Sequence, residues 1–379
     1  MDLKECRNEI DKINKELLDL FLRRMEISDN VAKYKADHGL PILNRARERE
    51  ILGEMTELAG EEFENYVKVL YSVIMDLSRS RQSALIKHNT AVSDKVRAAL
   101  EVSPKIFPKR AVVACQGTEG AYSQIAADKL FGIEKIHYFQ SFEEVFTAVR
   151  DGVCEYGVLP IENSTYGTVV EVYDLMKKFD FNIVRSTKIK VRHALLAPKG
   201  TNFENIKQVY SHPQAIGQCS EFFRANPQIK AVPCENTAVA AKLVSENSDG
   251  TVAALASNSC AELYGLDVIR EQVQNNFNNA TRFICISNNP FIFPGASKIS
   301  LMLTLPHVPG SLYNTLAKFT AEGLNLTKLE SRPIEGSDFE AQFYFDLDAS
   351  PYDEKVLALL DSLAYECESF SFLGAYNEV

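Results

Sequence analysis

The sequence lacks the patterns that mark several large protein classes. Its eight cysteines never form a Cys-x-x-Cys pair, so neither a structural zinc site nor a disulfide framework is expected. No stretch stays apolar for the ~18 residues that a membrane span needs. A Gly-x-Gly-x-x-Gly, a Walker loop and a His-Glu-x-x-His are also missing, which removes the main support for dinucleotide, nucleotide and zinc-hydrolase functions. We therefore expect no cofactor and no metal.

An excess of positive charge is missing as well. The formal net charge of -10 argues against a nucleic-acid partner, because phosphate binding requires a concentrated basic face. Small anionic substrates stay possible, since a site can be locally cationic on an acidic protein. Residues 1–5 show no signal-peptide pattern, and the scattered cysteines fit a reducing compartment. We expect a cytoplasmic protein that does not enter membranes.

With 379 residues the chain is too long for one ordinary core, given about 100 to 200 residues per domain. The apolar periodicity changes along it, and between residues 89 and 109 it fades among prolines and charges, which predicts a linker. We expect three domains, at residues 1–88, 110–289 and 297–377.

The first segment predicts one long helix. Residues 3–37 contain no glycine or proline, and apolar residues recur at spacings of three and four: Ile10, Ile13, Leu17, Leu20, Ile27 and Val31. At 1.5 Å per residue this amphipathic helix would be roughly 50 Å long. One small domain cannot cover it, so we predict a homodimer or a higher homo-oligomer.

Three cations interrupt the apolar face of this helix, namely Arg7, Arg24 and Lys35. An unpaired buried charge is costly, so an anion is expected to meet them. The alternative is that each side chain extends to solvent or pairs with acidic neighbours. Arg7 lies about 25 Å from Arg24 along the axis. One small ligand can therefore touch both only if an antiparallel partner helix supplies Arg7.

Two further helices are predicted, from residue 44 to about 58 and from 61 to about 88, and the second carries Ser78 and Gln82 as a polar i, i+4 pair. Together with the cations, these residues resemble the all-helical, intertwined chorismate mutases over the first 88 residues. The resemblance implies that Arg24 and the partner's Arg7 clamp the two carboxylates of chorismate. It implies that Lys35 and Gln82 bond to the ether oxygen.

The same resemblance gives roles to four more residues of this pocket. Glu48 would hold the ring hydroxyl, while Ser78 and Arg47 would complete the pocket. Asn44 also belongs to it, although relatives often carry Asp at that position. Because the rearrangement to prephenate is pericyclic, holding the dianion compact and stabilising charge on the ether oxygen suffices.

From residue 111 the pattern alternates between strands and helices, which predicts two α/β lobes. In such lobes, ligands sit beyond the carboxyl ends of strands. Polar clusters at these ends are Glu162-Asn163-Ser164, Ser211-His212-Pro213-Gln214 with Gln218, and Thr281-Arg282. The alternative for Asn163, Ser164 and Ser211 is that each caps a helix.

Taken together with Gly117 to Ser123, these motifs resemble prephenate dehydratase over about residues 110–287. The resemblance implies a two-lobed, periplasmic-binding-protein-like domain. Thr281 would be the essential hydroxyl that assists departure of the ring hydroxyl as carbon dioxide leaves, and Arg282 would anchor a carboxylate. The remaining cleft residues would be Glu162, Asn163, Ser164, Ser211 and Gln218. Formation of the aromatic ring drives this reaction. We interpret His193 and His212 as structural residues and not as catalytic ones.

The last segment predicts the order βαββαβ, which is ferredoxin-like, and resembles the ACT amino-acid-sensing domain. Its motifs Gly310-Ser311-Leu312 and Glu330-Ser331-Arg332-Pro333 look like the phenylalanine-binding signature of dehydratase regulators. The resemblance implies that L-phenylalanine binds between paired ACT domains, with a helix N-terminus near Ser311 facing its carboxylate. The alternative is turn chemistry with a buried Arg–Glu pair.

We therefore expect a bifunctional enzyme of phenylalanine biosynthesis that converts chorismate through prephenate to phenylpyruvate and is feedback-inhibited by L-phenylalanine. Asn44 motivates one alternative, a dehydratase whose helical domain serves only to dimerise. A non-catalytic, two-lobed amino-acid-binding regulator is another.

Overall fold

The computed structural model describes residues 2–85, 91–247, 249–308, 310–334 and 341–379. The chain divides into two compact units. The first consists of residues 1–98 and 297–372, and the second of residues 99–296 and 373–379. Among the described helices, none is both long and apolar enough to cross a membrane.

The N-terminal helices have the predicted bounds. Helix α1 spans Leu3–Asp37 and begins with a capping box between Asp2 and Glu5. Helix α2 spans Arg45–Leu85 and is broken at Gly60, whose φ of 71° is non-helical, so it consists of the two predicted segments. The expected end of the second segment at residue 88 lies outside the described residues.

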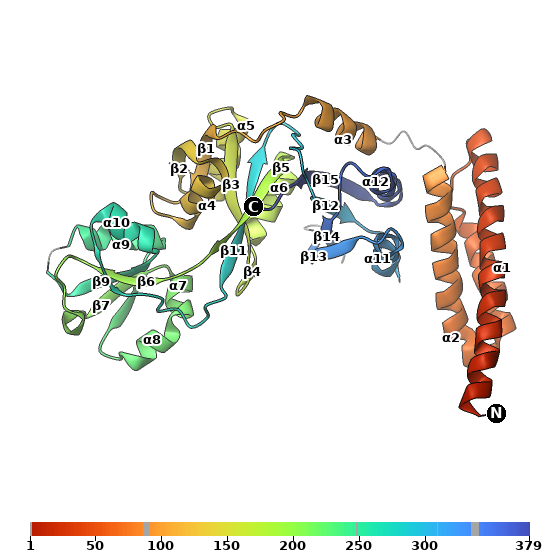
Figure 1. Ribbon diagram of the computed structural model, residues 1–379, viewed down its shortest axis with the longest axis horizontal. Coiled ribbons are helices and arrows are strands. Elements are labelled where there is room, and N and C mark those ends of the chain that lie inside the picture. Colours follow the sequence, from red (N-terminus) through yellow and green to blue (C-terminus); the bar gives the residue numbers. More distant parts are fainter. Residues whose placement is uncertain (1, 86–90, 248, 309, 335–340) are drawn as a thin grey trace. The chain divides into compact units, whose positions relative to one another are not determined.

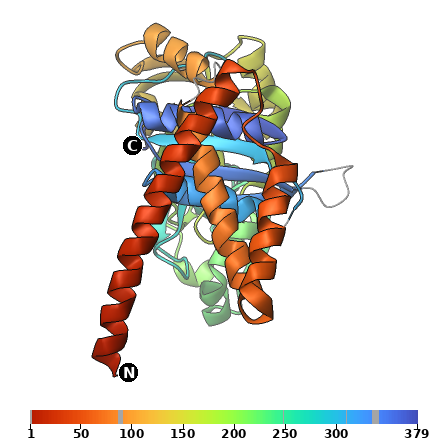
Figure 2. The ribbon, with the colours of Figure 1, turned by 90° about the vertical axis from the view of Figure 1, so that its right-hand side faces the viewer.

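Most of the apolar face of α1 is exposed within one chain. The buried side chains of α1 are Ser28 and Ala32, both in the C-terminal half that packs on α2. Figure 2 shows the N-terminal half of α1 running away from α2. The apolar residues that recur along this helix are exposed: Ile10 55%, Ile13 52%, Leu17 56%, Leu20 59%, Ile27 62% and Val31 38%.

The segment predicted as a linker, residues 89–109, contains helix α3, Ala91–Val102. Ser93, Val96 and Ala99 are buried at helical spacing. The helical period is therefore present, but it lasts too few turns among charged residues to stand out in the sequence. Pro104 follows, where the chain leaves the helix.

The second unit contains two sheets, as the two-lobe prediction requires. The first has the order β2-β1-β3-β11-β5, with β4 beside β3. β1 is parallel to β2 and β3, and β11 is antiparallel to β3 and β5. Its strands are β1 Arg110–Gln116, β2 Ile133–Phe139, β3 Tyr156–Asn163, β4 Gly167–Thr168, β5 Asn182–Lys190 and β11 Ala280–Ser287, with helices α4 Tyr122–Phe131, α5 Phe142–Arg150 and α6 Val170–Phe179.

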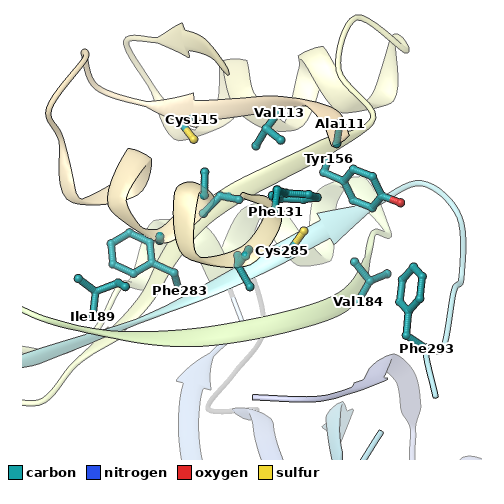
Figure 3. Packing of buried hydrophobic residues seen from close by; sticks show 14 residues of the cluster. Ala111, Val113, Cys115, Phe131, Tyr156, Val184, Ile189, Phe283, Cys285 and Phe293 are labelled. Atoms are coloured by element: carbon teal, nitrogen blue, oxygen red, sulfur yellow. The ribbon is translucent and has the colours of Figure 1, made fainter. Parts of the chain in front are cut away.

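The core of this first lobe fixes the orientation of β11. Figure 3 shows Phe283 and Cys285 of β11 directed into the cluster that contains Phe131, Val113 and Tyr156. Because side chains alternate along a strand, the residue between Phe283 and Thr281 lies on the opposite face of the sheet. That residue is Arg282.

The second sheet has the order β10-β6-β9-β7-β8. The chain passes between the sheets twice, after β5 and again before β11. The strands are β6 Ala194–Ala197, β7 Gln208–Ser211, β8 Lys230–Pro233, β9 Val252–Ala256 and β10 Asp267–Arg270, and the helices are η1 Phe203–Asn205, α7 Pro213–Gln218, α8 Ser220–Ala225, α9 Thr237–Ser245 and α10 Asn258–Tyr264.

The last segment has the predicted βαββαβ order, and its sheet order is β13-β14-β12-β15. Phe319 of its first helix packs on Phe345 of the sheet, with ring centroids 5.4 Å apart. The elements, labelled in Figure 1, are β12 Lys298–Thr304, α11 Ser311–Ala321, β13 Asn325–Pro333, β14 Ala341–Asp348, α12 Glu354–Glu366 and β15 Ser369–Tyr376.

Candidate active sites

The first candidate site lies between the C-terminal half of α1 and the second segment of α2. The Arg24 guanidinium donates a hydrogen bond to Ser78 Oγ. Lys35 Nζ lies 2.5 Å from the carbonyl oxygen of Ile42 and 3.4 Å from Gln82 Oε1. Ser78 and Gln82 are both buried. A single chain therefore brings together four of the predicted mutase residues, which lie on two helices.

A carboxylate and a further cation belong to the same surroundings. The pKa of Lys35 is lowered, mainly by burial. The negative charge of nearby Glu48 raises this pKa, and the positive charge of Arg79 lowers it further. Glu48 itself forms an ion pair with Arg79. Sequence reasoning missed Arg79, whose position beside Ser78 on the helix was the available signal.

Three other predicted mutase residues lie differently. Asn44 caps the start of α2, since its Oδ1 accepts a hydrogen bond from the Arg47 N–H at 3.1 Å. The Arg47 side chain is exposed and pairs with Glu50 at 2.6 Å. Arg7 is exposed near the start of α1. The arrangement of one chain thus leaves Arg7 and Arg47 outside the cluster around Lys35.

The second candidate site is a cavity of about 580 Å³ between the two sheets of the second unit. Both sheets and their connections contribute side chains to its wall. Of the predicted dehydratase residues, Asn163, Gln218 and Thr281 line it. Other lining residues include Gly117, Tyr122, Ser123, Tyr166, His193, His212, Gln214, Glu235, Asn236, Thr237 and Phe283.

Asn163 fixes the hydroxyl group of Thr281. Its Nδ2 donates to Thr281 Oγ1 at 2.9 Å, and its Oδ1 accepts from the N–H groups of Thr165 and Tyr166, each at 3.0 Å. Those two backbone donors determine which end of the amide faces Thr281. Because Thr281 Oγ1 accepts a hydrogen bond there, its own proton is free to point elsewhere, and the residue lines the cavity.

Two histidines that we had interpreted as structural also line this cavity. His193 Nε2 lies 2.6 Å from Gln218 Oε1, and an amide oxygen accepts, so the ring carries its proton on Nε2. Burial lowers the pKa of His193, and the bond to Gln218 partly opposes the shift. His212 Nδ1 accepts from the Gln214 N–H at 3.2 Å, and burial lowers the pKa of His212 too. Both rings are therefore neutral near pH 7.

Four predicted dehydratase residues are absent from the described lining of the cavity. Arg282 lies on the other face of β11 and pairs with Glu162, with Nε 3.5 Å from Oε2, and its role as a carboxylate anchor stays a prediction. Ser211 is fully buried, and its Oγ donates to the carbonyl of Leu255 at 2.7 Å. Ser164 Oγ accepts from the Ala280 N–H at 3.0 Å.

The capping alternative for these polar clusters is wrong at two positions. Ser211 does not cap α7, because the N-cap is His212. Asn163 bonds to backbone N–H groups in a turn that follows β3, where no helix of the described chain begins. The tertiary contacts of Asn163 and Ser211 were not visible as a local pattern.

The third candidate site is a cavity of about 480 Å³ in the last segment of the chain. Its wall contains the predicted residues Gly310, Ser311 and Leu312. Gly310 has a φ of 91°, and Ser311 Oγ donates to the carbonyl of Pro306 at 2.6 Å, so a tight turn leads into α11.

The second predicted effector motif lies elsewhere in one chain. Glu330, Ser331, Arg332 and Pro333 lie on β13, which pairs with β14, and they are not part of the described lining of this cavity. Across the described residues, no cluster of three or more His, Cys, Asp or Glu is arranged to hold a metal ion.

Two family models match separate parts of the chain. A family model for prephenate dehydratase matches residues 113–291, and one for chorismate mutase type II matches residues 6–83. The chain is 30% identical over 382 residues to the bifunctional chorismate mutase/prephenate dehydratase of Escherichia coli, covering 99% of this chain and 96% of that protein.

Solved structures resemble about 70% of the chain. The prephenate dehydratase of Arthrobacter aurescens in complex with L-Phe is 28% identical, with a TM-score of 0.64, and the match covers 70% of this chain and 90% of that chain. GqqA, described as a novel type of quorum quenching acylase, is 31% identical with a TM-score of 0.65, covering 71% of this chain and 98% of that one.

Proposed function

Because the chain belongs to the family of bifunctional chorismate mutase/prephenate dehydratases, we propose that its α1–α2 site makes prephenate and its inter-sheet cavity consumes it. As a member of this family it is an enzyme of phenylalanine biosynthesis with both activities. The product of the second reaction is phenylpyruvate. The domains are residues 1–88, 110–289 and 297–377.

The mutase residues act on chorismate by charge and position. Arg24 binds one carboxylate, and Lys35 with Gln82 bonds to the ether oxygen as its C–O bond breaks. Lys35 Nζ lies 3.4 Å from Oε1 of the buried Gln82 side chain, which supports this assignment. Charge that develops on the ether oxygen is stabilised strongly where water is excluded. Asn44 serves by capping α2, so its difference from Asp in relatives leaves this chemistry in place.

A second copy of the chain completes the mutase site. The exposed apolar face of α1 supports a homodimer, because burying it against a partner removes apolar surface from water. Arg7 is exposed and far along α1 from Arg24, so an antiparallel partner helix would supply it. The eight free cysteines fit a cytoplasmic enzyme with reduced thiols.

In the dehydratase step, the carbon–carbon bond to the ring carboxylate breaks and its electron pair enters the ring. The ring hydroxyl leaves from the opposite carbon, takes up a proton and departs as water, while carbon dioxide is released. Thr281 donates a hydrogen bond to the leaving oxygen. The observation that carries this role is the bond from Asn163 Nδ2 to Thr281 Oγ1, which leaves the hydroxyl proton for a ligand in the cavity.

Substitution of Thr281 tests the dehydratase assignment. We expect Thr281→Ala to lower the rate of phenylpyruvate formation from prephenate by about 10²- to 10³-fold, the loss typical of one transition-state donor. Thr281→Ser, which keeps the hydroxyl, is the matched control and retains most of the activity. Chorismate consumption by the same preparations stays at the wild-type rate. A Thr281→Ala enzyme with full dehydratase activity would disprove the role.

Chorismate consumption also separates the enzyme from its alternatives. A chain whose helices only dimerise, or a non-catalytic regulator, would leave chorismate unchanged in an ultraviolet assay. We expect turnover, abolished by Arg24→Ala and unaffected by Thr281→Ala.

The last domain acts as an ACT sensor that binds L-phenylalanine and inhibits the dehydratase. The cavity at Gly310 to Leu312 and the L-Phe complex of the Arthrobacter relative support this proposal. Glu330, Ser331, Arg332 and Pro333 of β13 contribute from a paired domain. Calorimetry and kinetics test it: binding is expected together with loss of prephenate turnover, and undiminished turnover at saturating L-phenylalanine would refute it.

A further inference from the structure

Arg79 is a half-buried cation next to the mutase residues for which the reaction itself gives no role. It follows Ser78 on α2, and its side chain is 14% exposed. It pairs with Glu48 from the first segment of α2 and with Asp76 one turn earlier on its own segment. The Asp76 side chain is 4% exposed. One guanidinium thus joins two carboxylates, one on each segment of α2.

The contact of Arg79 with Glu48 affects how the Glu48 carboxylate can bind the substrate. A guanidinium donates through a rigid, planar fork, so it fixes the direction of a carboxylate that it binds. Arg79 contacts Glu48 Oε1. The other oxygen, Oε2, then has a defined orientation from which it can accept a hydrogen bond from the ring hydroxyl of chorismate.

The net charge of the site also supports a role for Arg79 in binding the substrate. Of the described residues, five charged side chains connect to one another or to Ser78 here, three cationic and two anionic: Arg24, Lys35, Arg79, Glu48 and Asp76. Their sum is one positive charge, and Arg7 from a partner would raise it to two, which matches a dicarboxylate. Without Arg79 the chain's own contribution would fall to zero, and the site would lose much of its attraction for a dianion.

From this geometry we propose that Arg79 is a positioning residue of the mutase site, which orients Glu48 toward the ring hydroxyl of chorismate and neutralises Asp76. This inference rests on the proposed mutase function. A purely structural role is the competing explanation, because Arg79 also ties the two segments of α2 together and compensates a buried carboxylate.

The test uses the full chain with Arg79→Met, Glu48→Gln and the double variant, assayed for chorismate loss. We expect each single change to lower kcat/KM about 10- to 100-fold, as the loss of a hydrogen bond to a charged group does. If Arg79 acts through Glu48, the double variant is hardly slower than Glu48→Gln alone. Arg79→Lys, which keeps the charge without the fork, recovers part of the activity.

Arg81 provides a matched control on the same segment. It forms a two-bond pair with Asp29 of α1, at 2.9 and 2.8 Å, and its side chain is 52% exposed. Arg81→Met therefore removes an inter-helix ion pair of the same kind and is expected to leave mutase kinetics within about twofold, as exposed pairs contribute little. Circular dichroism at 222 nm verifies that each variant keeps its helices.

Two results would overturn the proposal. One is a wild-type kcat/KM for Arg79→Met. The other is a double variant whose fold-loss in kcat/KM equals the product of the fold-losses of Arg79→Met and Glu48→Gln. That result would mean that Arg79 acts independently of Glu48. If Arg79→Met loses its helical signal, the comparison is made with Arg79→Lys in both backgrounds and the same two results apply. Failure of the mutase function itself is distinct, since the unmodified chain would then leave chorismate untouched.

Discussion

At the scale of single residues, the cavity proposed for the dehydratase reaction contains side chains whose hydrogen-bonding direction is already fixed. The Asn163 amide is held by two backbone N–H groups, and it holds Thr281 Oγ1 in turn. The His193 ring is likewise held by Gln218. Such fixed dipoles need no reorganisation during the reaction, which is the main source of electrostatic catalysis.

Asn163→Asp tests the fixed direction of the Thr281 hydroxyl. A carboxylate has nearly the shape of the amide but only accepts hydrogen bonds, so it would draw the Thr281 proton toward itself and away from the substrate. We expect kcat for prephenate to fall about 10²- to 10³-fold. Steady-state kinetics would measure it, with chorismate turnover as the internal control. An unchanged kcat would show that the direction of this hydroxyl is irrelevant.

His193 should make stability depend on pH. Its folded-state pKa lies below the ordinary value of 6.5, because burial disfavours the charged ring. The unfolded chain therefore binds more protons between that lowered pKa and pH 6.5, and the free energy of unfolding decreases as the pH falls through this window. Above pH 6.5 the contribution is fully present.

Urea denaturation of the wild type and of His193→Gln at several pH values would measure this effect. The variant is expected to show a smaller dependence on pH below 6.5, whatever its stability at pH 7. His307→Gln, which changes an exposed ring, is expected to keep the wild-type slope. Equal slopes for all three proteins would contradict the assignment.

At the scale of elements, neighbouring residues of strand β11 have different roles, because some line the cavity and others form contacts within the sheet. Thr281 and Phe283 line the cavity, whereas Arg282 between them pairs with Glu162 across the strands. Adjacent residues of a motif thus differ in role because a strand alternates its faces. β11 in turn pairs along its length with β5.

A glycine near the end of the chain shows how closely another strand approaches β5. Gly374 of β15 has a φ of 144°, and a Cβ there would overlap the carbonyl oxygen of Ile183 and lie 3.0 Å from its N atom. We expect Gly374→Ala to lower the free energy of unfolding by about 2–5 kcal/mol, from overlap and backbone strain combined.

Gly132→Ala is the control for this prediction. Gly132 has a φ of 83° at the end of α4, but a Cβ would meet no atom within 4 Å. It should cost only the backbone strain, about 1–2 kcal/mol. Denaturant midpoints of the two variants would separate overlap from strain, and equal midpoints would exclude the overlap.

At the scale of the whole molecule, the mutase site is expected to need two chains. The long helix α1 carries Arg24 and Lys35 near α2, while its N-terminal half, with Arg7, has its apolar face exposed. A two-fold dimer would create two equivalent sites, each using Arg7 of the other chain.

Mixing two inactive variants tests this sharing. Arg7→Ala and Arg24→Ala each remove one residue from every site of their own dimer. A mixed dimer has one site that contains both arginines, so unfolding and refolding an equal mixture should restore roughly a quarter of the wild-type mutase activity, given random pairing of two-fold dimers. The variants refolded separately are the control. If no activity returns while a wild-type control refolds to full activity, Arg7 and Arg24 do not serve the same site across the dimer.

Most of the helices and strands could be predicted from the amino-acid pattern alone. Long-range periodicity predicted α1, the break near Gly60 and the succession of strands, because burial selects the same face of an element many times over. A resemblance of spaced motifs placed Arg24, Lys35, Ser78 and Gln82 in one pocket. The structure brings Arg24 into contact with Ser78, and Lys35 into contact with Gln82.

Which of these residues come into contact could not be predicted and follows from how the chain folds. The fold turned Arg282 and Ser211 away from the cavity, brought His193 and His212 to it, and joined Arg79 to Glu48, which lies 31 positions away along the chain. Such contacts depend on how strands pair and how helices fold back. The periodic pattern shows which face of an element is buried, but it does not show which distant residue a given side chain contacts.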